Sequence, residues 1–495
     1  MAIDTVEFLR GKNILVIGAT GFLGKVFMEK ILRVQPEVGC IFALIRAKNI
    51  QSARTRLQNQ VISSELFRLI RERCTEDGYE KLMAQKLVPV VGDIALDFLG
   101  IEESVRDELC PKIHIVVNSA ATTSFYERYD IAMKVNALGC RNLINFCKSC
   151  CRLEALCHIS TAYVNVESTG IITEEVLKMG EKLPYNSRAI EPSDIESECY
   201  LMRKSLKEFR IFSEEKWSEE NETKHMKELG LKRAREFGWP NAYVLTKAMG
   251  EMMVDYLRED IPTIIIRPSI IESSITEPFA GWMEGNRMID PLIVGYGKGR
   301  ITSFLIDPLL ILDVIPVDMV ANSMIVSIAR HGTEPGLFLY HATSSVANPL
   351  HYNVVVDATY NYFLKNPCTA KNGKVVRVKE PYFLQSMSSF TLYMTLCFKI
   401  PLQLLCILDK LLFGFLRPHC NHLLDKYRFG MSLAQIYEPF LFFKGKFDSS
   451  KTERLWEEMS GDDRKIFSLD VKSINWEDYF LNSHIPGLVK YIIRR

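Results

Sequence analysis

The segment Gly18-Ala-Thr-Gly21-Phe-Leu-Gly24 lies between a short apolar run at residues 13–17 and an apolar helical pattern at residues 23–34. Glycines at this spacing, after a buried strand and at the start of a helix, are typical of a dinucleotide-binding turn, because they let the backbone approach a pyrophosphate closely. The helix start also offers free N–H groups and a partial positive charge. We predict that the turn binds a cofactor through Gly18, Thr20, Gly21, Phe22, Leu23 and Gly24.

Beyond this turn, short apolar runs alternate with helical patterns. Strands are expected at residues 13–17, 40–45, 87–91, 113–118, 155–159 and 263–266. Strands separated by helices imply βαβ units, in which a parallel sheet is buried on both faces. The pattern therefore predicts a doubly wound α/β fold rather than a sandwich.

The length and composition indicate a folded protein with more than one part. The chain has 495 residues, of which 47% are hydrophobic and 24% charged. We place a Rossmann domain at residues 1–348, with a charged helical insertion near residues 171–237, and a mostly helical C-terminal domain at residues 349–495. Lys plus Arg number 61 and Asp plus Glu number 60, so the net charge gives no reason to expect a nucleic-acid partner.

The end of the second strand indicates which nicotinamide cofactor binds. NAD-binding folds usually have a carboxylate there, which holds the ribose 2′-hydroxyl. This chain instead has Arg46-Ala-Lys48, and a guanidinium can pair with the 2′-phosphate of NADPH through two hydrogen bonds. We predict an NADP-binding Rossmann domain that uses Arg46 and Lys48; the alternative is an ordinary surface arginine.

Later strand ends supply weaker cofactor candidates. Asp93 and Ile94 follow the third strand, where a carboxylate can accept a hydrogen bond from the adenine amino group. Asn118 and Ala120 end the fourth, where small residues let the backbone lie against the ribose. Pro268 closes the last strand-like run and would border the nicotinamide amide.

Tyr243-Val-Leu-Thr-Lys247 is the candidate catalytic motif. Residues i and i+4 share one face of a helix. The reference pKa of tyrosine is near 10, and an ammonium about 4 Å away at an effective dielectric near 20 attracts the phenolate by roughly 4 kcal/mol. We therefore expect Lys247 to lower the pKa of Tyr243 toward neutrality, where acid–base catalysis is most effective. The same motif often occurs by chance as a surface pair.

Hydroxyl and amide side chains complete the predicted site. Ser160 and Thr161 follow the strand at residues 155–159, so one hydroxyl should point into the cofactor cleft and donate to the substrate carbonyl. Thr161 is our choice and Ser160 the reserve. Asn136 either holds a proton-relay water or is a capping or packing residue. No metal site is expected.

These motifs together resemble the extended short-chain dehydrogenases. The segment Gly238-Trp-Pro-Asn-Ala-Tyr-Val-Leu-Thr-Lys-Ala-Met-Gly-Glu251 is similar to the active-site segment of fatty acyl-CoA reductases, especially the plant type. Supporting segments are Glu277-Pro-Phe-Ala-Gly-Trp282, Tyr437-Glu-Pro-Phe440 and His484-Ile-Pro-Gly487. The resemblance implies reduction of a long-chain acyl-CoA to a primary fatty alcohol through an aldehyde, with two NADPH consumed and coenzyme A released.

Two other functions remain open at this stage: another NADP(H)-dependent short-chain reductase or epimerase, and a non-catalytic NADPH-binding scaffold. The apolar stretch at residues 390–416 is interrupted by charges and a proline, so we expect peripheral membrane association at most. Because no signal or transit leader is visible, we expect the cytoplasm or the cytosolic face of the endoplasmic reticulum rather than the plastid. The oligomeric state is not predicted.

Overall fold

The computed structural model describes residues 4–182, 189–212, 218–370, 373–411 and 417–493. Its centre is a seven-stranded sheet with the strand order β11-β7-β5-β4-β1-β2-β3, in which every pairing is parallel. The strands are β1 (Ile14–Ile17), β2 (Ile41–Ile45), β3 (Leu87–Val91), β4 (Ile115–Asn118), β5 (Ala155–Ile159), β7 (Thr263–Pro268) and β11 (Leu337–Ala342). The predicted doubly wound α/β fold is confirmed. The strand order reverses between β1 and β4, which is where such sheets bind ligands.

The strands are apolar runs without alternation because helices cover both faces of the sheet. Every residue of β1 and of β5 is buried. Strand β11 was not predicted. Its sequence ends in Tyr340-His-Ala, and the polar groups of Tyr340 and His341 interrupt the apolar pattern that predicts a buried strand. The last four residues of the strand are nevertheless buried. It extends the sheet beyond β7 through a six-residue register.

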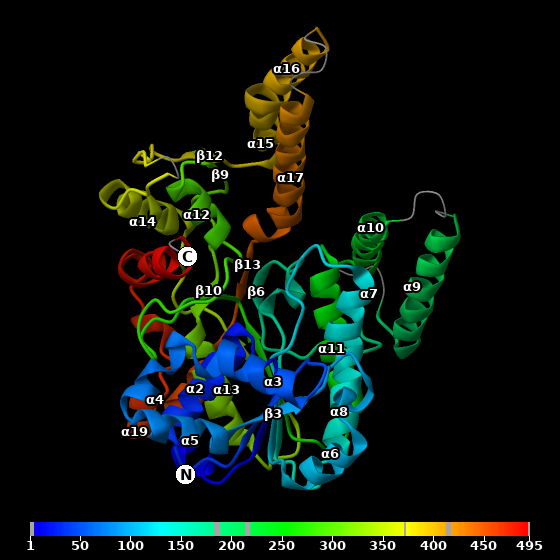
Figure 1. Ribbon diagram of the computed structural model, residues 1–495, viewed down its shortest axis with the longest axis vertical. Coiled ribbons are helices and arrows are strands. Elements are labelled where there is room, and N and C mark those ends of the chain that lie inside the picture. The colour runs from blue at the N-terminus through cyan, green and yellow to red at the C-terminus, as the bar shows by residue number, and fades with distance from the viewer. Residues whose placement is uncertain (1–3, 183–188, 213–217, 371–372, 412–416, 494–495) are drawn as a thin grey trace.

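Two groups of helices enclose the sheet (Figure 1). Helices α2 (Phe22–Val34) and α13 (Val317–His331) pack together on one face. On the other face, α8 (Gly139–Lys148) and α11 (Ala242–Leu257) pack together with a π-helical turn at Met133–Leu138. In the stretch where an insertion is predicted, α9 (Pro192–Phe212) and α10 (Glu219–Phe237) lie outside the sheet.

Shorter elements connect these layers. They are α1 (Thr5–Phe8), α3 (Ile50–Leu57), α4 (Arg68–Glu72), α5 (Glu76–Lys86), α6 (Glu103–Leu109), α7 (Tyr129–Ala132), α12 (Asp290–Gly297), α14 (Tyr352–Lys365), α18 (Ser450–Glu458), α19 (Gly461–Ile466), α20 (Trp476–Asp478), α21 (Ile485–Leu488), β8 (Ile270–Glu272) and β10 (Val314–Pro316).

The C-terminal segment returns to the sheet domain. Strand β12 (Tyr382–Leu384) pairs with β9 (Ser303–Leu305), and β13 (Gly445–Phe447) pairs with β6 (Gly170–Ile172). Buried apolar residues from both ends of the chain belong to one continuous core. The domain boundary near residue 349 stays a prediction, because the later residues share this core.

A helical hairpin projects from the body (Figure 1). Helix α15 (Met387–Met394), the π-helical turn Thr395–Lys399 and α16 (Ile400–Leu411) run on as one helix, and α17 (Arg417–Leu441) packs beside it. Within the described residues, the helix Met387–Asp409 has 23 residues and a mean hydropathy of 1.7, with 6% of its apolar window buried; length and composition would let it cross a membrane.

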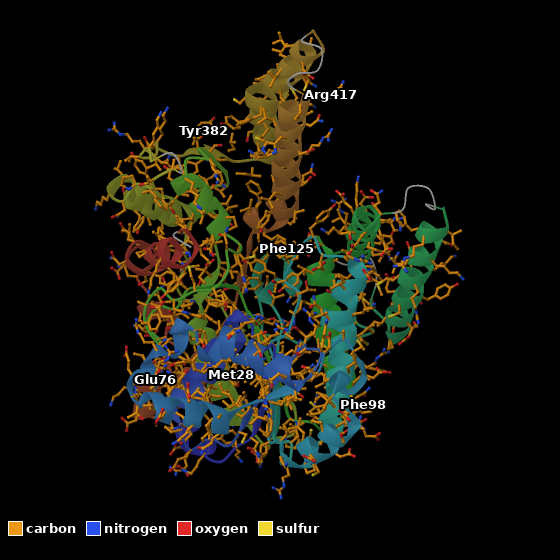
Figure 2. The ribbon with its side chains drawn as sticks, viewed as in Figure 1. Met28, Glu76, Phe98, Phe125, Tyr382 and Arg417 are labelled. Carbon is orange, nitrogen blue, oxygen red and sulfur yellow. The ribbon has the colours of Figure 1, made fainter. Side chains whose placement is uncertain are left out.

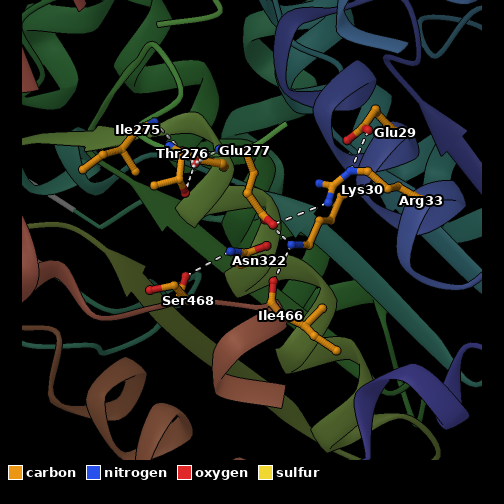
Figure 3. A network of polar contacts seen from close by, with 10 residues as sticks. Glu29, Lys30, Arg33, Ile275, Thr276, Glu277, Asn322, Ile466 and Ser468 are labelled. Carbon is orange, nitrogen blue, oxygen red and sulfur yellow. Dashed lines mark hydrogen bonds and ion pairs between the residues drawn. The ribbon is translucent and has the colours of Figure 1, made fainter. Parts of the chain in front are cut away.

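A polar network fixes α2 to the segment that follows β8 and to the C-terminal segment (Figure 3). Glu277 accepts hydrogen bonds from Lys30 and from Arg33, the latter at 3.4 Å. Lys30 also donates to the carbonyl of Ile466. Nearby, Asn322 of α13 donates to the carbonyl of Ser468 at 3.0 Å. The helix that follows the glycine turn is therefore held from two sides.

Candidate active site

The glycine turn forms a cradle that larger residues would fill. Gly18 has φ +88°, and a Cβ atom there would lie 2.7 Å from the backbone nitrogen of Ala120. A Cβ atom on Gly24 would lie 2.4 Å from the carbonyl oxygen of Gly18. Gly21 is exposed and is the N-cap of α2, with no side-chain hydrogen bond at the cap. The first N–H groups of α2 can therefore bind the pyrophosphate of a dinucleotide.

The side chains of Phe22 and Leu23 are buried. Phe22 stacks on Trp282, with ring centroids 5.3 Å apart. These two predicted residues can therefore offer a cofactor only their backbone N–H groups. Trp282 belongs to a loop at residues 275–287 whose Glu284 pairs with Lys25, in the first turns of α2, at 2.7 Å. The packing of this loop on the glycine turn was not predicted from the sequence.

The two predicted cations for the 2′-phosphate lie directly after β2. The side chains of Arg46 and Lys48 are exposed, and Thr20, on the glycine turn, is half-buried. The backbone carbonyl of Arg46 accepts a hydrogen bond from Arg56. This position suits contact with a phosphate, and the roles of Arg46 and Lys48 stay predictions.

Asn118, Ala120, Asp93 and Ile94 also lie at or near the carboxyl edge of the sheet. Asn118 is buried and pairs in register with Ile17 at the end of β1. Its amide oxygen accepts a hydrogen bond from Ala120 N at 3.2 Å. Asp93 is half-buried and already accepts from Ala95 N at 3.0 Å, whereas Ile94 is buried. These residues surround the turn, and their contacts with a cofactor stay predictions.

Thr161 and Tyr243 come together at the end of β5. Asn241 caps α11 by accepting a hydrogen bond from Val244 N at 3.0 Å, which places Tyr243 in the first turn. Burial raises the pKa of Tyr243 to about 12, while a hydrogen bond to Thr161 acts to lower it. The Thr161 hydroxyl also lies 3.5 Å from the carbonyl of Pro268. Thr161, the first choice from sequence, therefore faces Tyr243.

Ser160 has a different environment. Its hydroxyl is buried and has no hydrogen-bond partner among the described residues. Its backbone N–H donates to Ile266 O at 2.8 Å, so β5 and β7 hold its position. The structure therefore gives no catalytic partner to Ser160 in the part of the chain it describes.

Lys247 is buried one helical turn beyond Tyr243. Its ammonium donates to the backbone carbonyl of Ile159 at 2.5 Å. Burial lowers the pKa of Lys247, while nearby Cys140 and Glu251 act to raise it. The expected lowering of the Tyr243 pKa by Lys247 is not found, because burial of the phenol dominates and raises this pKa.

Asn136 lies in the π-helical turn and is buried. Its amide oxygen accepts from Thr122 N at 3.0 Å, and its amide nitrogen donates at 3.1 Å to Thr122 O and to the Thr246 hydroxyl. Gly250 permits this packing, since a Cβ atom there would lie 2.1 Å from Asn136 O. These contacts fit the packing alternative for Asn136, and its water-holding role stays a prediction.

Aromatic rings from α17 form one wall of the site. Phe125 lies 5.6 Å from Tyr243, 4.6 Å from Phe440 and 5.5 Å from Tyr437, measured between ring centroids. Figure 2 shows Phe125 beside the base of the projecting hairpin. A pocket of about 530 Å³ lies beside this wall, lined by Phe125, Trp239, Asn241, Gln435, Ile436 and Pro439. The segment Tyr437-Glu-Pro-Phe440 supported the family resemblance, but its contact with Phe125, next to Tyr243, was not predicted.

A doubly wound parallel sheet, a glycine turn at a helix start, and a tyrosine–threonine pair with a lysine one turn on define a reductase of the extended short-chain dehydrogenase class. Comparison with known proteins gives the family. The family described as Male sterility protein matches residues 16–324, and a second match with the same description covers residues 399–495. This chain belongs to the fatty acyl-CoA reductases, as the resemblance indicated.

The relatives match along the whole chain. The probable fatty acyl-CoA reductase 5 of Arabidopsis thaliana is 43% identical, with 100% of both chains covered. The alcohol-forming fatty acyl-CoA reductase of Simmondsia chinensis is 40% identical, with 99% of this chain and 98% of that one covered. This membership favours the reductase over the epimerase alternative.

Solved structures share the fold. The terminal R domain from the myxalamid PKS-NRPS biosynthetic pathway has a TM-score of 0.56 at 18% identity, with 99% of this chain and 95% of that one covered. The reductase domain of a non-ribosomal peptide synthetase from Mycobacterium tuberculosis has a TM-score of 0.57 at 16% identity, with 99% and 94% covered.

Proposed function

We propose that this protein reduces a long-chain fatty acyl-CoA to a primary fatty alcohol through an aldehyde, with NADPH as reductant and coenzyme A released. The observation that carries the proposal is the pairing of Thr161 with Tyr243 next to the aromatic wall, at the same edge of the sheet as a glycine turn suited to a dinucleotide. The relatives' names add an acyl-CoA substrate and, for the Simmondsia chinensis protein, an alcohol product.

The protein's own groups account for the acid chemistry. When bound, NADPH supplies the hydride for each of the two reductions. Because burial raises the pKa of Tyr243 to about 12, its phenol is protonated at neutral pH and can donate to the carbonyl oxygen together with Thr161. Preorganised donors of this kind typically lower a barrier by about 3–4 kcal/mol each.

The first reduction yields a tetrahedral oxyanion at the thioester carbon. Its collapse breaks the C–S bond, and the thiolate leaves and takes a proton from solvent to give coenzyme A. The aldehyde stays in the same cleft for the second reduction, after which Tyr243 gives a proton to the alkoxide. Lys247, held on Ile159 O at 2.5 Å, fixes the backbone that carries Ser160 and Thr161.

The choice of NADPH over NADH rests on charge. Arg46 and Lys48 are exposed at the end of β2, where the ribose 2′-position of a bound dinucleotide would lie. Two cations favour a 2′-phosphate over a hydroxyl, because charge-assisted hydrogen bonds are about twice as strong as neutral ones.

When the substrate carbonyl lies at Tyr243, its acyl chain would extend along the aromatic wall. The rings of Phe125, Tyr437 and Phe440 are partly or fully buried and offer an apolar surface beside Tyr243. The adjoining pocket carries polar groups from Asn241 and Gln435. This mixture suits a thioester whose acyl chain is apolar and whose coenzyme arm is polar.

Peripheral membrane contact through the hairpin is part of the proposal. Seven large apolar side chains of α15, α16 and the turn between them are exposed by 41–60%: Leu392, Leu396, Phe398, Ile400, Leu404, Ile407 and Leu408. An apolar helix face of this extent is typical of a surface that contacts lipid. We place the protein on the cytosolic face of the endoplasmic reticulum, with the plastid as the alternative, and imaging of the tagged protein distinguishes them.

One assay tests the activity. The purified full-length protein is incubated with NADPH or NADH and a panel of acyl-CoAs of different chain length, and aldehyde, alcohol and free thiol are measured separately. We expect two NADPH oxidised and one thiol released for each alcohol. If NADPH is oxidised and aldehyde forms without alcohol, the protein is an aldehyde-forming reductase. Binding of NADPH with no turnover on any thioester would favour the scaffold alternative.

A further inference from the structure

Three ionisable side chains that are not part of the tyrosine–threonine pair meet in the interior. Glu272 ends β8, Asp290 begins α12, and His484 lies at the end of the π-helical turn Tyr479–His484. One ligand atom of each residue lies within 4.8 Å of the other two, and all three residues are buried. The imidazole Nε2 of His484 is 3.0 Å from Asp290 Oδ1 and 3.6 Å from Glu272 Oε2.

The second carboxylate oxygen of Glu272 is an independent sign that a ligand is needed. Oε1 is buried and has no hydrogen-bond partner among the described residues, although Glu272 is only 3% exposed. In the part of the chain that the structure describes, His484 is the only basic side chain paired with either carboxylate. Two buried carboxylates beside one imidazole are therefore short of positive charge, which is unfavourable because burial removes the carboxylates from water and leaves their charge uncompensated.

The opposite edge of the imidazole is fixed in the way that metal-binding histidines usually are. Nδ1 of His484 lies 3.1 Å from the Ser273 hydroxyl. That hydroxyl lies 3.1 Å from the Tyr479 hydroxyl, which in turn donates to Ser273 O at 2.7 Å. Outer hydrogen bonds of this kind set the tautomer and ring orientation of a ligand histidine. Here they direct Nε2 toward the two carboxylates.

We propose that Glu272, Asp290 and His484 bind one divalent cation of the zinc type. Imidazole nitrogen together with carboxylate oxygen is a ligand set that Zn²⁺ accepts, with Mn²⁺ the nearest competitor. The ligands come from three segments far apart in the sequence, so no local spacing reveals the site. The proposal rests on this geometry alone and does not depend on the reaction assigned to the protein.

The site would join the C-terminal segment to the loop over the glycine turn. Gly281 and Gly487 touch backbone to backbone, since a Cβ atom on Gly487 would lie 2.0 Å from Gly281 O. The neighbouring Trp282 stacks on Phe22 of the glycine turn. A cation held by His484 would therefore stabilise the loop that buttresses the cofactor site.

The test starts with the wild-type full-length protein, purified without chelator. We measure its zinc and manganese content by mass spectrometry, then strip it with EDTA and reload it with Zn²⁺ alone or Mn²⁺ alone. We expect about one Zn²⁺ per chain after dialysis, a lower melting temperature after stripping, and recovery on reloading. Co²⁺ in place of Zn²⁺ should give visible d–d absorption. If the purified protein contains no metal, and neither EDTA nor Zn²⁺ changes its melting temperature, the proposal is wrong.

Variants distinguish two ways in which the charge of the cluster could be neutralised, by a bound cation or by buried protons. Glu272→Gln keeps the side-chain shape and removes the charge, so a metal site predicts loss of bound Zn²⁺ and of the EDTA effect, with a lower melting temperature. If protons neutralise the cluster instead, the same variant should match or exceed the wild-type melting temperature. Glu284→Gln is the matched control, because Glu284 lies outside the cluster, and it should keep the wild-type zinc content. Should Glu272→Gln fail to fold, the wild-type stripping and Co²⁺ measurements decide alone.

Discussion

The rings of Phe125 and Phe440 stack nearly parallel, with centroids 4.6 Å apart and an interplanar angle of 14°. Phe125 precedes α7 in the sheet domain, and Phe440 ends α17 of the hairpin. Phe125 also contacts the ring of Tyr243. The C-terminal segment that carries Phe440 therefore forms part of the candidate active site. The C-terminal segment is therefore expected to influence which substrates are reduced.

Replacing Phe440 should change substrate preference more than chemistry. Phe440→Leu keeps an apolar side chain but removes volume and ring contacts, so we expect the stability to fall by about 0.5–3 kcal/mol. The acyl-chain profile should shift, with KM for the preferred acyl-CoA rising severalfold and kcat little changed. A panel of acyl-CoAs measures this. Phe398→Leu, on the exposed hairpin, is the control, and an identical profile for both variants would remove Phe440 from the substrate site.

Tyr243→Phe should remove the proton donor alone. The ring keeps its contact with Phe125, so NADPH binding should stay near the wild-type value. Loss of a general acid typically lowers the rate by about 10²–10⁴-fold. Tyr256→Phe on the same helix, where the side chain is 60% exposed, should keep full activity. Near-normal turnover by Tyr243→Phe would contradict the assigned role.

Arg46→Ala should weaken NADPH binding far more than NADH binding. A charge-assisted hydrogen bond contributes about 1.5–3 kcal/mol, so the Kd for NADPH should rise roughly tenfold to a hundredfold. Fluorescence titration with both cofactors measures the ratio. Arg54→Ala removes an exposed arginine of α3 and controls for a general loss of positive charge. Equal weakening of both cofactors would show that Arg46 does not bind the 2′-phosphate.

The sequence was sufficient where structure depends on neighbours along the chain. The glycine turn, the strand before it and the helix after it were predicted from spacing. Thr161 was chosen from its place at the end of a predicted strand, with Ser160 as the reserve. Burial was harder to predict. The i, i+4 spacing placed Lys247 near Tyr243 but could not show that its ammonium donates to Ile159 O instead.

Contacts between distant segments were not predictable from one sequence. Trp282 packs on Phe22, and Phe440 on Phe125, only because the fold brings these residues together. The cluster at Glu272 has the same origin, since its three members share no local motif. Strand β11 was missed for a different reason, because its buried Tyr340 and His341 make it look polar.

Glu174 should make stability depend on pH. Burial raises its pKa from 4.5 to about 7, although its carboxylate accepts hydrogen bonds from the backbone N–H groups of His341 and Lys451. Because the folded pKa exceeds the unfolded one, the contribution to stability is full below pH 4.5 and is lost as the pH rises through 7. The difference corresponds to about 3 kcal/mol at most.

Glu174→Gln should remove this dependence. The amide can accept only one of the two backbone hydrogen bonds, so below pH 4.5 the variant should be about 1 kcal/mol less stable than the wild-type protein, and its own stability should not change with the charge at this position as the pH rises. Urea unfolding at pH 5.5 and pH 8 should then show a larger loss for the wild-type protein than for the variant. If the wild-type protein and the variant lose the same free energy of unfolding between pH 5.5 and pH 8, Glu174 does not titrate in this range.

The exposed hairpin should bind lipid. Leu404 and Leu408 are 58% and 51% exposed on α16, one helical turn apart, so they share a face. Replacing both with Glu puts two charges on that face and should reduce flotation with anionic phospholipid vesicles at least tenfold, which corresponds to about 1.4 kcal/mol. Leu364→Glu, on α14 and 57% exposed, is the control outside the hairpin.

Turnover of a short, soluble acyl-CoA should stay unchanged in all variants, because α16 lies away from α11, the helix that carries Tyr243 (Figure 1). Unaltered flotation of the double variant would mean that α16 is not the membrane-contacting surface.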